Sequence, residues 1–153
     1  MDISKITDYL YVGTQPKDIG AYGVLHDLGI TLIINMRAEH EPRDDPLNPP
    51  IETIWFETHD RPSEPIPIKV FFEGVEKALF AMEAGGKIFV HCAGGRHRSV
   101  AMAAAILIVK GHSAQSAMEL LKSQRPEADP EAEHIRQRIE EFERRLKERE
   151  EDG

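Results

Sequence analysis

Apolar and polar residues follow one another along the chain with the periodicities of strands and helices. Short β-prone apolar runs predict strands at 9–12, 31–35, 52–58 and 87–91. Apolar residues at helical spacing predict helices at 18–28, 68–84, 99–110, 114–124 and from Glu131 to about Glu150. Because strands alternate with helices, we expect an α/β fold with a central, mostly parallel sheet of about four or five strands, flanked by helices.

Turn and cap residues set the predicted ends of these elements. The glycines expected to end a strand or a helix are Gly13, Gly29, Gly85, Gly86 and Gly111. Ser113 is expected to cap the helix at 114–124. Asp129 followed by Pro130 has the pattern of an N-cap with proline at the first helical position, so a charged C-terminal helix is expected over 129–150. Its apolar stripe consists of Ile135, Ile139, Phe142 and Leu146.

The length and composition are those of one globular domain. The 153 residues are 41% hydrophobic and 30% charged, so we expect a single domain over 1–153. No apolar run reaches the length of a membrane span, and the first residues lack the basic and apolar regions of a signal peptide. Cys92 is the only cysteine, which excludes an internal disulfide framework and fits a reducing compartment. We therefore expect a cytoplasmic protein with no membrane partner.

The net charge of −8 is concentrated near the C-terminus. Residues 127–153 contain 11 acidic and 6 basic residues, a net charge of −5, whereas residues 1–126 contain 16 acidic and 13 basic residues, a net charge of −3. A nucleic-acid-binding protein usually has a basic patch or stripe instead, so we expect no nucleic-acid partner. The apolar face of the last helix is expected to pack on its own core, which favours a monomer over pairing through that helix.

The segment from His91 to Ser99, with the sequence HCAGGRHRS, carries the clearest chemical signal in the chain. It places Cys92 six residues before Arg98, with two glycines between them. An apolar run precedes the segment and a helix-like run follows it, so the context is strand, tight loop and helix. Such a loop points backbone N–H groups toward one spot at the positive end of a helix dipole, which predicts an anion-binding site.

This loop suits a phosphate group and a sulfur nucleophile. Gly94 and Gly95 allow the backbone to bend, and Arg98 can bind two phosphate oxygens at once. The same positive potential favours the thiolate of Cys92, and a thiolate beneath a bound phosphate is a nucleophile aimed at phosphorus. The alternative, an inert buried cysteine beside a glycine turn, is disfavoured by the strand, loop and helix context.

The segment matches the Cys-x5-Arg-Ser/Thr signature of the cysteine-dependent protein tyrosine phosphatase superfamily. Over about residues 3–145 the chain resembles a small member of its dual specificity branch that consists of the catalytic domain alone. Further similarity lies in Ile6–Gly13, Leu28–Arg37 and Arg125-Pro126. The resemblance implies a metal-independent protein phosphatase that acts on phosphotyrosine, with phosphoserine and phosphothreonine as further candidates, through a cysteinyl-phosphate intermediate and without a cofactor.

A phosphatase of this kind also needs an acid that protonates the leaving oxygen. Asp60 is the candidate, because it follows a predicted strand in the proline-rich loop at 59–67 and lies 32 residues before the cysteine. In the resembled family the general acid lies on such a loop about thirty residues before the nucleophile. A turn-forming aspartate is the plain alternative. The rival acids are Glu57, expected within the strand, and Asp44 and Asp45 in the loop at 38–50.

The other residues of the motif receive roles from their positions. The residues expected to bind the substrate phosphate are Ala93, Gly94, Gly95, Arg96, His97 and Arg98. The Ser99 hydroxyl could hydrogen-bond the Cys92 sulfur and help the thiolate to leave, or cap the following helix, and both can hold. The resemblance implies that His91 orders the loop and favours the thiolate instead of acting as a base.

Three further residues have two interpretations each. Arg96 and His97 either add positive potential at the rim of the site or are solvated. Arg37 either touches the substrate or lies on the surface as an ordinary arginine.

Several other functions are compatible with the same motif. A phosphoinositide or an RNA 5′ end is an alternative substrate, although the loop lacks flanking lysines and the chain lacks a basic stripe. A phosphate-binding module without catalysis and a sulfur-transfer enzyme are further alternatives. The seven histidines include no His-x-x-x-His pair, so the spacing predicts no metal site. The expected partner is a phosphorylated protein or peptide substrate.

Overall fold

The computed structural model describes residues 1–152 of the chain. Five strands form one sheet in the order β1-β2-β5-β3-β4. They are β1 (Ile3–Thr7), β2 (Leu10–Thr14), β3 (Ile30–Asn35), β4 (Glu52–Trp55) and β5 (Lys87–Cys92). β1 and β2 are antiparallel, whereas β2, β5, β3 and β4 are parallel neighbours, so the predicted mostly parallel sheet is confirmed.

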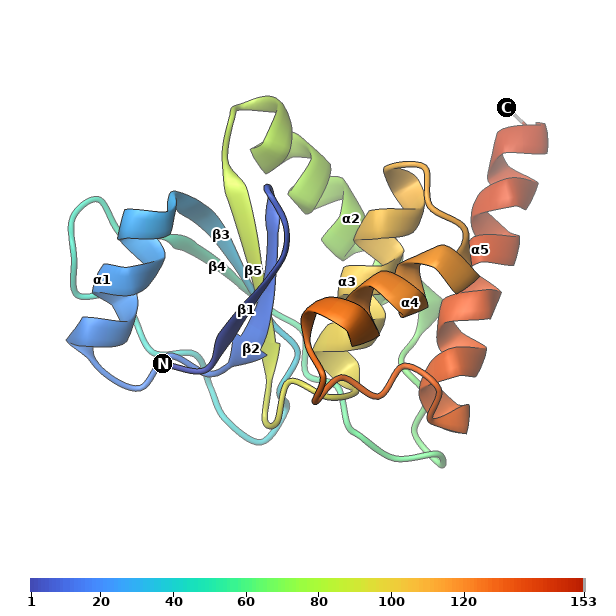
Figure 1. Ribbon diagram of the computed structural model, residues 1–153, viewed down its shortest axis with the longest axis horizontal. Helices are drawn as coiled ribbons and strands as arrows, with labels where there is room; N and C mark the ends of the chain where they lie inside the picture. Colours follow the sequence, from blue (N-terminus) through green and yellow to red (C-terminus); the bar gives the residue numbers. More distant parts are fainter. Residues whose placement is uncertain (153) are drawn as a thin grey trace.

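Helices cover both faces of this sheet unequally. They are α1 (Ile19–Leu28), α2 (Ile68–Glu83), α3 (Arg98–Val109), α4 (Ala114–Gln124) and α5 (Glu133–Asp152). Figure 1 shows α1 alone on one face and the other helices together on the opposite face, with α5 outermost. Two of the predicted caps are present, since Ser113 Oγ accepts from Ser116 N at 3.0 Å and Gly29 closes α1 with a φ of 85°. Helix ends otherwise differ from the predicted ones by a residue or two.

The core has a large and a small part, one on each face of the sheet. On the α1 face, Tyr22 and Leu25 pack on Ile33 and Phe89 in a small cluster. On the other face, the large cluster centres on α3, in which every residue from Arg98 to Ile108 is buried. A helix that is apolar all round must be surrounded by other elements, and α2, α4 and α5 surround α3.

The central position of β5 fixes where the motif lies. β5 pairs with β2 on one side and β3 on the other, and α3 begins a few residues after β5 ends. The segment between them therefore lies at the carboxyl edge of a parallel sheet, where such folds bind ligands. Neither end of this segment can shift without disturbing the core.

Two strand predictions were wrong at their ends. β2 does not stop at Gly13 but continues to Thr14, and a Cβ at Gly13 would lie 2.1 Å from the carbonyl oxygen of Asp2, so the close approach of β1 requires glycine there. β4 ends at Trp55 because its partner β3 ends at Asn35, which leaves Glu57 exposed beyond the strand.

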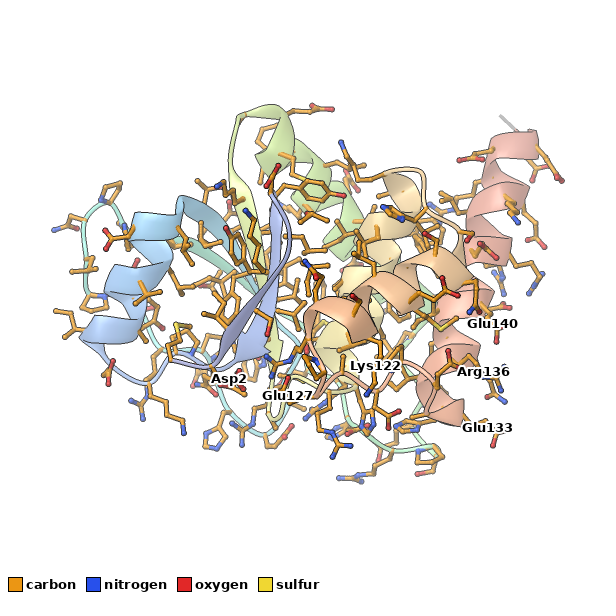
Figure 2. The ribbon with its side chains drawn as sticks, viewed as in Figure 1. Asp2, Lys122, Glu127, Glu133, Arg136 and Glu140 are labelled. Carbon is orange, nitrogen blue, oxygen red and sulfur yellow. The ribbon has the colours of Figure 1, made fainter. Side chains whose placement is uncertain are left out.

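The predicted start of the last helix was also wrong. Pro130 lies in a turn, Asp129 precedes it outside any helix, and α5 begins at Glu133. The Asp129 carboxylate does not cap the helix, because its Oδ2 lies 3.1 Å from Nε2 of His97. The turn segment is fastened by Lys122, whose Nζ donates to the carbonyl oxygens of Pro126 and Ala128 at 2.8 and 3.0 Å (Figure 2).

α5 has one apolar face and one charged face, as its sequence predicts. Ile135, Ile139 and Phe142 are buried against the core. The outer face carries Glu133, Arg136 and Glu140, which are labelled in Figure 2, and Arg136 Nη1 donates to Glu140 Oε1 at 2.8 Å. Among residues 1–152, no helix has both the length and the apolar content that crossing a membrane requires.

Replacing Phe142 by alanine should strongly destabilise the protein. The ring is fully buried and its centroid lies 5.9 Å from that of Phe71 and 4.9 Å from that of Phe72. Removing such a ring leaves a cavity, and we expect the free energy of unfolding to fall by about 3–5 kcal/mol in urea titrations. The control Glu140→Ala, on the exposed face, should change it by less than about 0.5 kcal/mol. A loss below about 1 kcal/mol for Phe142→Ala would contradict the packing described.

Candidate active site

Residues 92–98, called the phosphate-binding loop from here on, connect β5 to α3. Cys92 is the last residue of β5 and Arg98 is the first residue of α3. Ala93, Gly94 and Arg96 are exposed, whereas Gly95 is buried and has a φ of 63°. That left-handed backbone favours glycine, and a Cβ there would lie 2.5 Å from Nη2 of Arg125 and 2.8 Å from the carbonyl oxygen of Gly13.

The Cys92 sulfur has a hydroxyl group as its neighbour. Cys92 is only 3% exposed, and its Sγ lies 3.1 Å from Oγ of Ser99. Ser99 is the second residue of α3 and does not cap the helix, since the N-cap position belongs to His97. Of the two interpretations of Ser99, the structure therefore contradicts the cap and places the hydroxyl on the sulfur.

Arg98 is held in place by a glutamate that sequence reasoning did not single out. Arg98 Nη1 and Nη2 donate to the two carboxylate oxygens of Glu39 at 2.7 and 3.0 Å, and Nη1 also donates to the carbonyl oxygen of Thr58 at 2.7 Å. The hydrogen bonds from Arg98 hold the pKa of Glu39 at about 2, so the pair is ionised at neutral pH. Among residues 1–152, the buried Nε of Arg98 has no hydrogen-bond partner, so it is a donor available to an anion.

A second arginine braces the phosphate-binding loop from behind. The Arg125 side chain is 1% exposed, and its Nε donates to the carbonyl oxygen of Gly95 at 2.8 Å. Its Nη1 and Nη2 each donate to a carboxylate oxygen of Asp2 at 2.9 Å, and Nη1 also reaches Ser4 Oγ at 3.1 Å. The hydrogen bonds to Asp2 raise the pKa of Arg125. This contact ties the loop to the N-terminal residues and to the end of α4.

Asp60, the expected general acid, lies between two histidines. Its Oδ2 lies 2.8 Å from Nδ1 of His97, and its Oδ1 lies 2.7 Å from Nε2 of His134. Burial acts to raise the pKa of Asp60, but the hydrogen bonds from His134 and His97 outweigh it, and the pKa lies below its usual value. The carboxylate form of Asp60 is therefore favoured. His97 joins Asp60 to the phosphate-binding loop and is not a freely solvated side chain.

The rival acids are less suited to the site. Asp45 is buried in its own loop, where it accepts from the backbone N–H groups of Leu47 and Ile51, each at 2.9 Å, and contacts His26 Nε2 at 2.6 Å. That pattern shapes the loop and leaves no oxygen of Asp45 free for a substrate. Asp44, its neighbour in the same loop, and Glu57 are exposed, and among residues 1–152 neither makes a hydrogen bond or ion pair with the phosphate-binding loop.

His91 lies beneath the loop, inside the sheet. It is buried and stacks on Phe89, with ring centroids 5.5 Å apart. Burial lowers the pKa of His91 to about 4, so its ring is neutral at pH 7. Its backbone carbonyl oxygen accepts from Met36 N at 2.9 Å, which links β5 to the segment carrying Glu39. A neutral, enclosed ring is consistent with a structural role for His91 and not with a role as a base.

Arg37 and Arg96 differ in their surroundings. The Arg37 side chain is partly buried and donates to Glu39 Oε2 and Gln15 Oε1, both at 3.3 Å. Arg37 thus supports the glutamate that orients Arg98. Arg96 points its side chain to the exposed rim, while its carbonyl oxygen accepts from Asp129 N at 2.9 Å.

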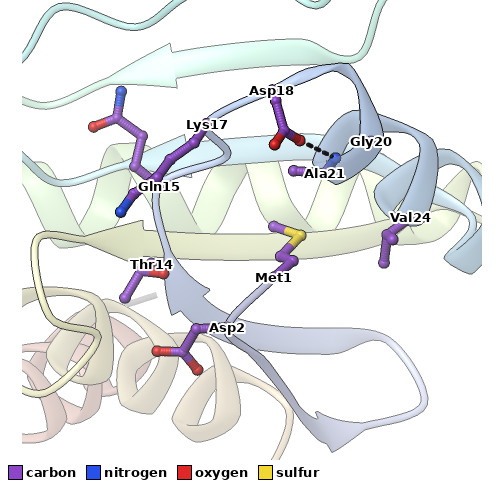
Figure 3. Close-up of a pocket in the computed structure, with 9 residues that line it drawn as sticks. All are labelled: Met1, Asp2, Thr14, Gln15, Lys17, Asp18, Gly20, Ala21 and Val24. Atoms are coloured by element: carbon purple, nitrogen blue, oxygen red, sulfur yellow. Dashed lines mark hydrogen bonds between the residues drawn. The ribbon is translucent and has the colours of Figure 1, made fainter.

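A separate pocket lies beside α1 and holds none of the predicted site residues. It has a volume of about 370 Å³ and is lined by Met1, Asp2, Thr14, Gln15, Lys17, Asp18, Gly20, Ala21 and Val24 (Figure 3). Asp18 in this pocket caps α1, because its Oδ1 accepts from Ala21 N at 2.8 Å. The pocket holds neither the cysteine nor the arginine of the motif, so we locate the chemistry at the phosphate-binding loop.

The relationship of the chain to known proteins agrees with this geometry. A family model described as "dual specificity phosphatase, catalytic domain" matches residues 10–145. The chain belongs to this family. The resemblance read from the motif, the α/β fold and the class of protein phosphatases are thereby confirmed.

Individual relatives are similar over most of this phosphatase domain. Dual specificity phosphatase 28 of Mus musculus is 31% identical over 132 residues, which are 83% of this chain and 76% of that protein. Protein-tyrosine-phosphatase MKP1 of Arabidopsis thaliana is 32% identical over 84% of this chain, which corresponds to 16% of that larger protein. The crystal structure of human DUSP28 superposes with a TM-score of 0.84 at 26% identity and covers 96% of both chains.

Three residues of this site were missed by the sequence analysis. Glu39 and His134 come from a loop and a charged helix in which many acidic and basic residues look alike. Arg125 was noted only as part of a similar late segment, and its burial was the missing information. The sequence carried no local signal for any of the three, because each acts through a partner at least 30 residues away.

The stabilising effect of Glu39 should depend on pH. The pKa of Glu39 is about 2 in the folded protein and about 4.3 in an unfolded chain, so its contribution to stability is present above about pH 4.3 and is lost as the pH falls through about 2. In urea titrations, the loss of stability caused by Glu39→Gln should therefore be greatest near pH 6 and shrink toward pH 2. Glu41→Gln, on the same loop, should show no such trend, and a loss for Glu39→Gln that stays constant with pH would refute the ion pair.

Proposed function

We propose that this protein is a metal-independent protein phosphatase that hydrolyses phosphotyrosine, with phosphoserine and phosphothreonine as further substrates, through a cysteinyl-phosphate intermediate. One observation carries the proposal. The phosphate-binding loop begins with Cys92, whose sulfur contacts the Ser99 hydroxyl. The loop ends with Arg98, whose Nε has no hydrogen-bond partner among residues 1–152. This pairing suits a nucleophile that attacks a bound oxyanion.

In the first step the Cys92 thiolate attacks phosphorus, so that an S–P bond forms while the P–O bond to the leaving group breaks. Asp60 in its acid form gives its proton to the departing oxygen. In the second step the Asp60 carboxylate takes a proton from water, whose oxygen attacks phosphorus. The S–P bond then breaks, which releases inorganic phosphate and returns the thiolate. No step requires a metal ion or a cofactor.

The surrounding groups stabilise charge in both steps. Arg98, oriented by Glu39, faces the phosphoryl oxygens, whose negative charge it balances in the transition state. The Ser99 hydroxyl, 3.1 Å from the sulfur, donates to the thiolate as it leaves in the second step. The backbone of Ala93, Gly94, Gly95, Arg96 and His97 follows the same loop and supplies the further N–H groups for the phosphate.

Replacing Cys92 by serine should abolish turnover and keep phosphate binding. With p-nitrophenyl phosphate in the presence of EDTA, we expect the rate to fall by a factor on the order of 10⁴ or more, because the nucleophile is lost. A phosphotyrosyl peptide should still bind to the variant, since Arg98 and the loop are retained. Turnover that survives in Cys92→Ser, or wild-type turnover that disappears in EDTA alone, would contradict the proposal. A panel of phosphotyrosine, phosphothreonine and phosphoinositide substrates would test the substrate class.

Replacing Asp60 by asparagine should reduce turnover according to the leaving group. A phosphothreonyl peptide releases a poor leaving group and depends on protonation, so its kcat should fall by roughly 10²–10⁴-fold. p-Nitrophenyl phosphate releases a good leaving group and should be affected far less in the first step. The matched control is Glu57→Gln, three residues away and exposed, which should leave both rates unchanged. An equal loss of turnover for both substrates, or no loss, would show that another residue is the acid.

A further inference from the structure

Four side chains from separate parts of the chain meet at the rim of the phosphate-binding loop. Asp60 comes from the segment after β4, His97 from the end of the loop, Asp129 from the segment before α5 and His134 from the first turn of α5. Asp60 contacts both histidines, at 2.8 and 2.7 Å, and His97 also contacts Asp129 at 3.1 Å. A cluster of two imidazoles and two carboxylates exceeds what orienting a single acid requires.

The geometry points to a binding site for one divalent transition-metal ion, zinc above all, formed by Asp60, His97 and His134. The candidate ligand atoms of these residues all lie within 4.8 Å of one another. Two imidazole nitrogens and a carboxylate oxygen are a ligand set that zinc favours, at about 2.0–2.2 Å from the ion. Tetrahedral ligands at that distance are about 3.3 Å apart, so modest side-chain rotations would open the present hydrogen bonds enough to admit the ion.

Asp129 gives His97 a second carboxylate partner, an arrangement that is common for metal-bound histidines. His97 turns Nδ1 toward Asp60 and Nε2 toward Asp129. A metal-binding histidine usually donates its second ring N–H to a carboxylate, which fixes the tautomer and the orientation of the ring. The His97 and His134 rings also pack edge to face, with centroids 5.2 Å apart, which limits their rotation.

The charge and accessibility of the cluster are compatible with a cation. The nearby N-termini of α3 and α5 oppose a positive ion, but the carboxylates of Asp60 and Asp129 offset them. The side chains of His97, His134 and Asp60 are 19%, 21% and 35% exposed, so an ion can reach them from solvent. Three protein ligands leave a fourth position for water or for an oxygen of a bound phosphate.

Occupation of this site would regulate the phosphatase. This consequence rests on the proposed function, because it assumes that Asp60 is the proton donor. A metal ion bound to Asp60 occupies the oxygen lone pair that has to carry the proton. Zinc should therefore inhibit turnover reversibly. Magnesium and calcium prefer all-oxygen sites and should not inhibit.

The experiment measures metal binding directly, separately from activity. Zn²⁺ alone is titrated into the full chain by calorimetry, and Co²⁺ alone is added to record the visible bands of a tetrahedral ion. The same titrations on Cys92→Ser decide whether the histidine cluster or the thiolate binds the metal. We expect one Zn²⁺ per chain with equal affinity in both proteins, and a Co²⁺ spectrum without a sulfur-to-metal charge-transfer band.

Variants of the cluster then locate the site. His134→Ala and His97→Ala should each weaken Zn²⁺ binding by at least about tenfold, and Asp129→Asn by about 10–100-fold, the usual effect of removing a partner of a metal-bound histidine. The matched control His112→Ala removes a histidine that instead contacts Ser116 at 2.9 Å, and should leave Zn²⁺ affinity unchanged. Two different histidine variants keep the test valid if one of them fails to fold.

The outcomes separate the metal site from the proposed function. Zn²⁺ binding that is lost in Cys92→Ser, or that both histidine variants retain in full, would overturn the metal site. A failure of the catalytic proposal would instead appear as turnover that survives in Cys92→Ser, whatever the Zn²⁺ affinity. Inhibition by Zn²⁺ that weakens in parallel with affinity in His134→Ala would support both the site and its link to Asp60.

Discussion

The buried guanidinium of Arg125 holds the phosphate-binding loop in its shape. A charge that is almost completely removed from water must be paired and hydrogen-bonded, and Arg125 finds its partners in Asp2 and in the carbonyl oxygens of Gly94 and Gly95. Those two carbonyl groups therefore turn away from the phosphate side of the loop. Gly95 permits the turn, because a side chain there would collide with Arg125 itself.

The charges around the site are arranged so that each is oriented by another. Arg98 is oriented by Glu39, which Arg37 contacts in turn. Asp60 is oriented by His97 and His134, and His97 by Asp129. Groups fixed in this way need little reorganisation when a phosphoryl group reacts, which is the main source of electrostatic catalysis. The same contacts hold the candidate metal-ligating atoms of Asp60, His97 and His134 within 4.8 Å of one another.

Local signals in the sequence predicted most of the elements and the centre of the site. Hydrophobic periodicity located the strands and helices, since burial on one or both faces leaves a pattern in any segment. The HCAGGRHRS segment identified Cys92, Arg98 and Ser99, because a strand, a glycine loop and a helix place such neighbours together without help from elsewhere. Errors arose where a distant partner decided the outcome, as at Asp129, which has the local pattern of a cap but contacts His97.

The sequence by itself determined the α/β architecture and the loop that carries the proposed nucleophile Cys92 and its arginine, Arg98. Only the tertiary structure decided which acids and bases surround that loop, namely that Glu39 orients Arg98, that Arg125 is buried behind Gly95 and that His134 meets Asp60. The physical reason is the distance along the chain over which each signal acts. Periodicity, turns and loop motifs act between near neighbours in the chain, whereas a side-chain hydrogen bond between residues 59 or 74 positions apart exists only after the core has packed.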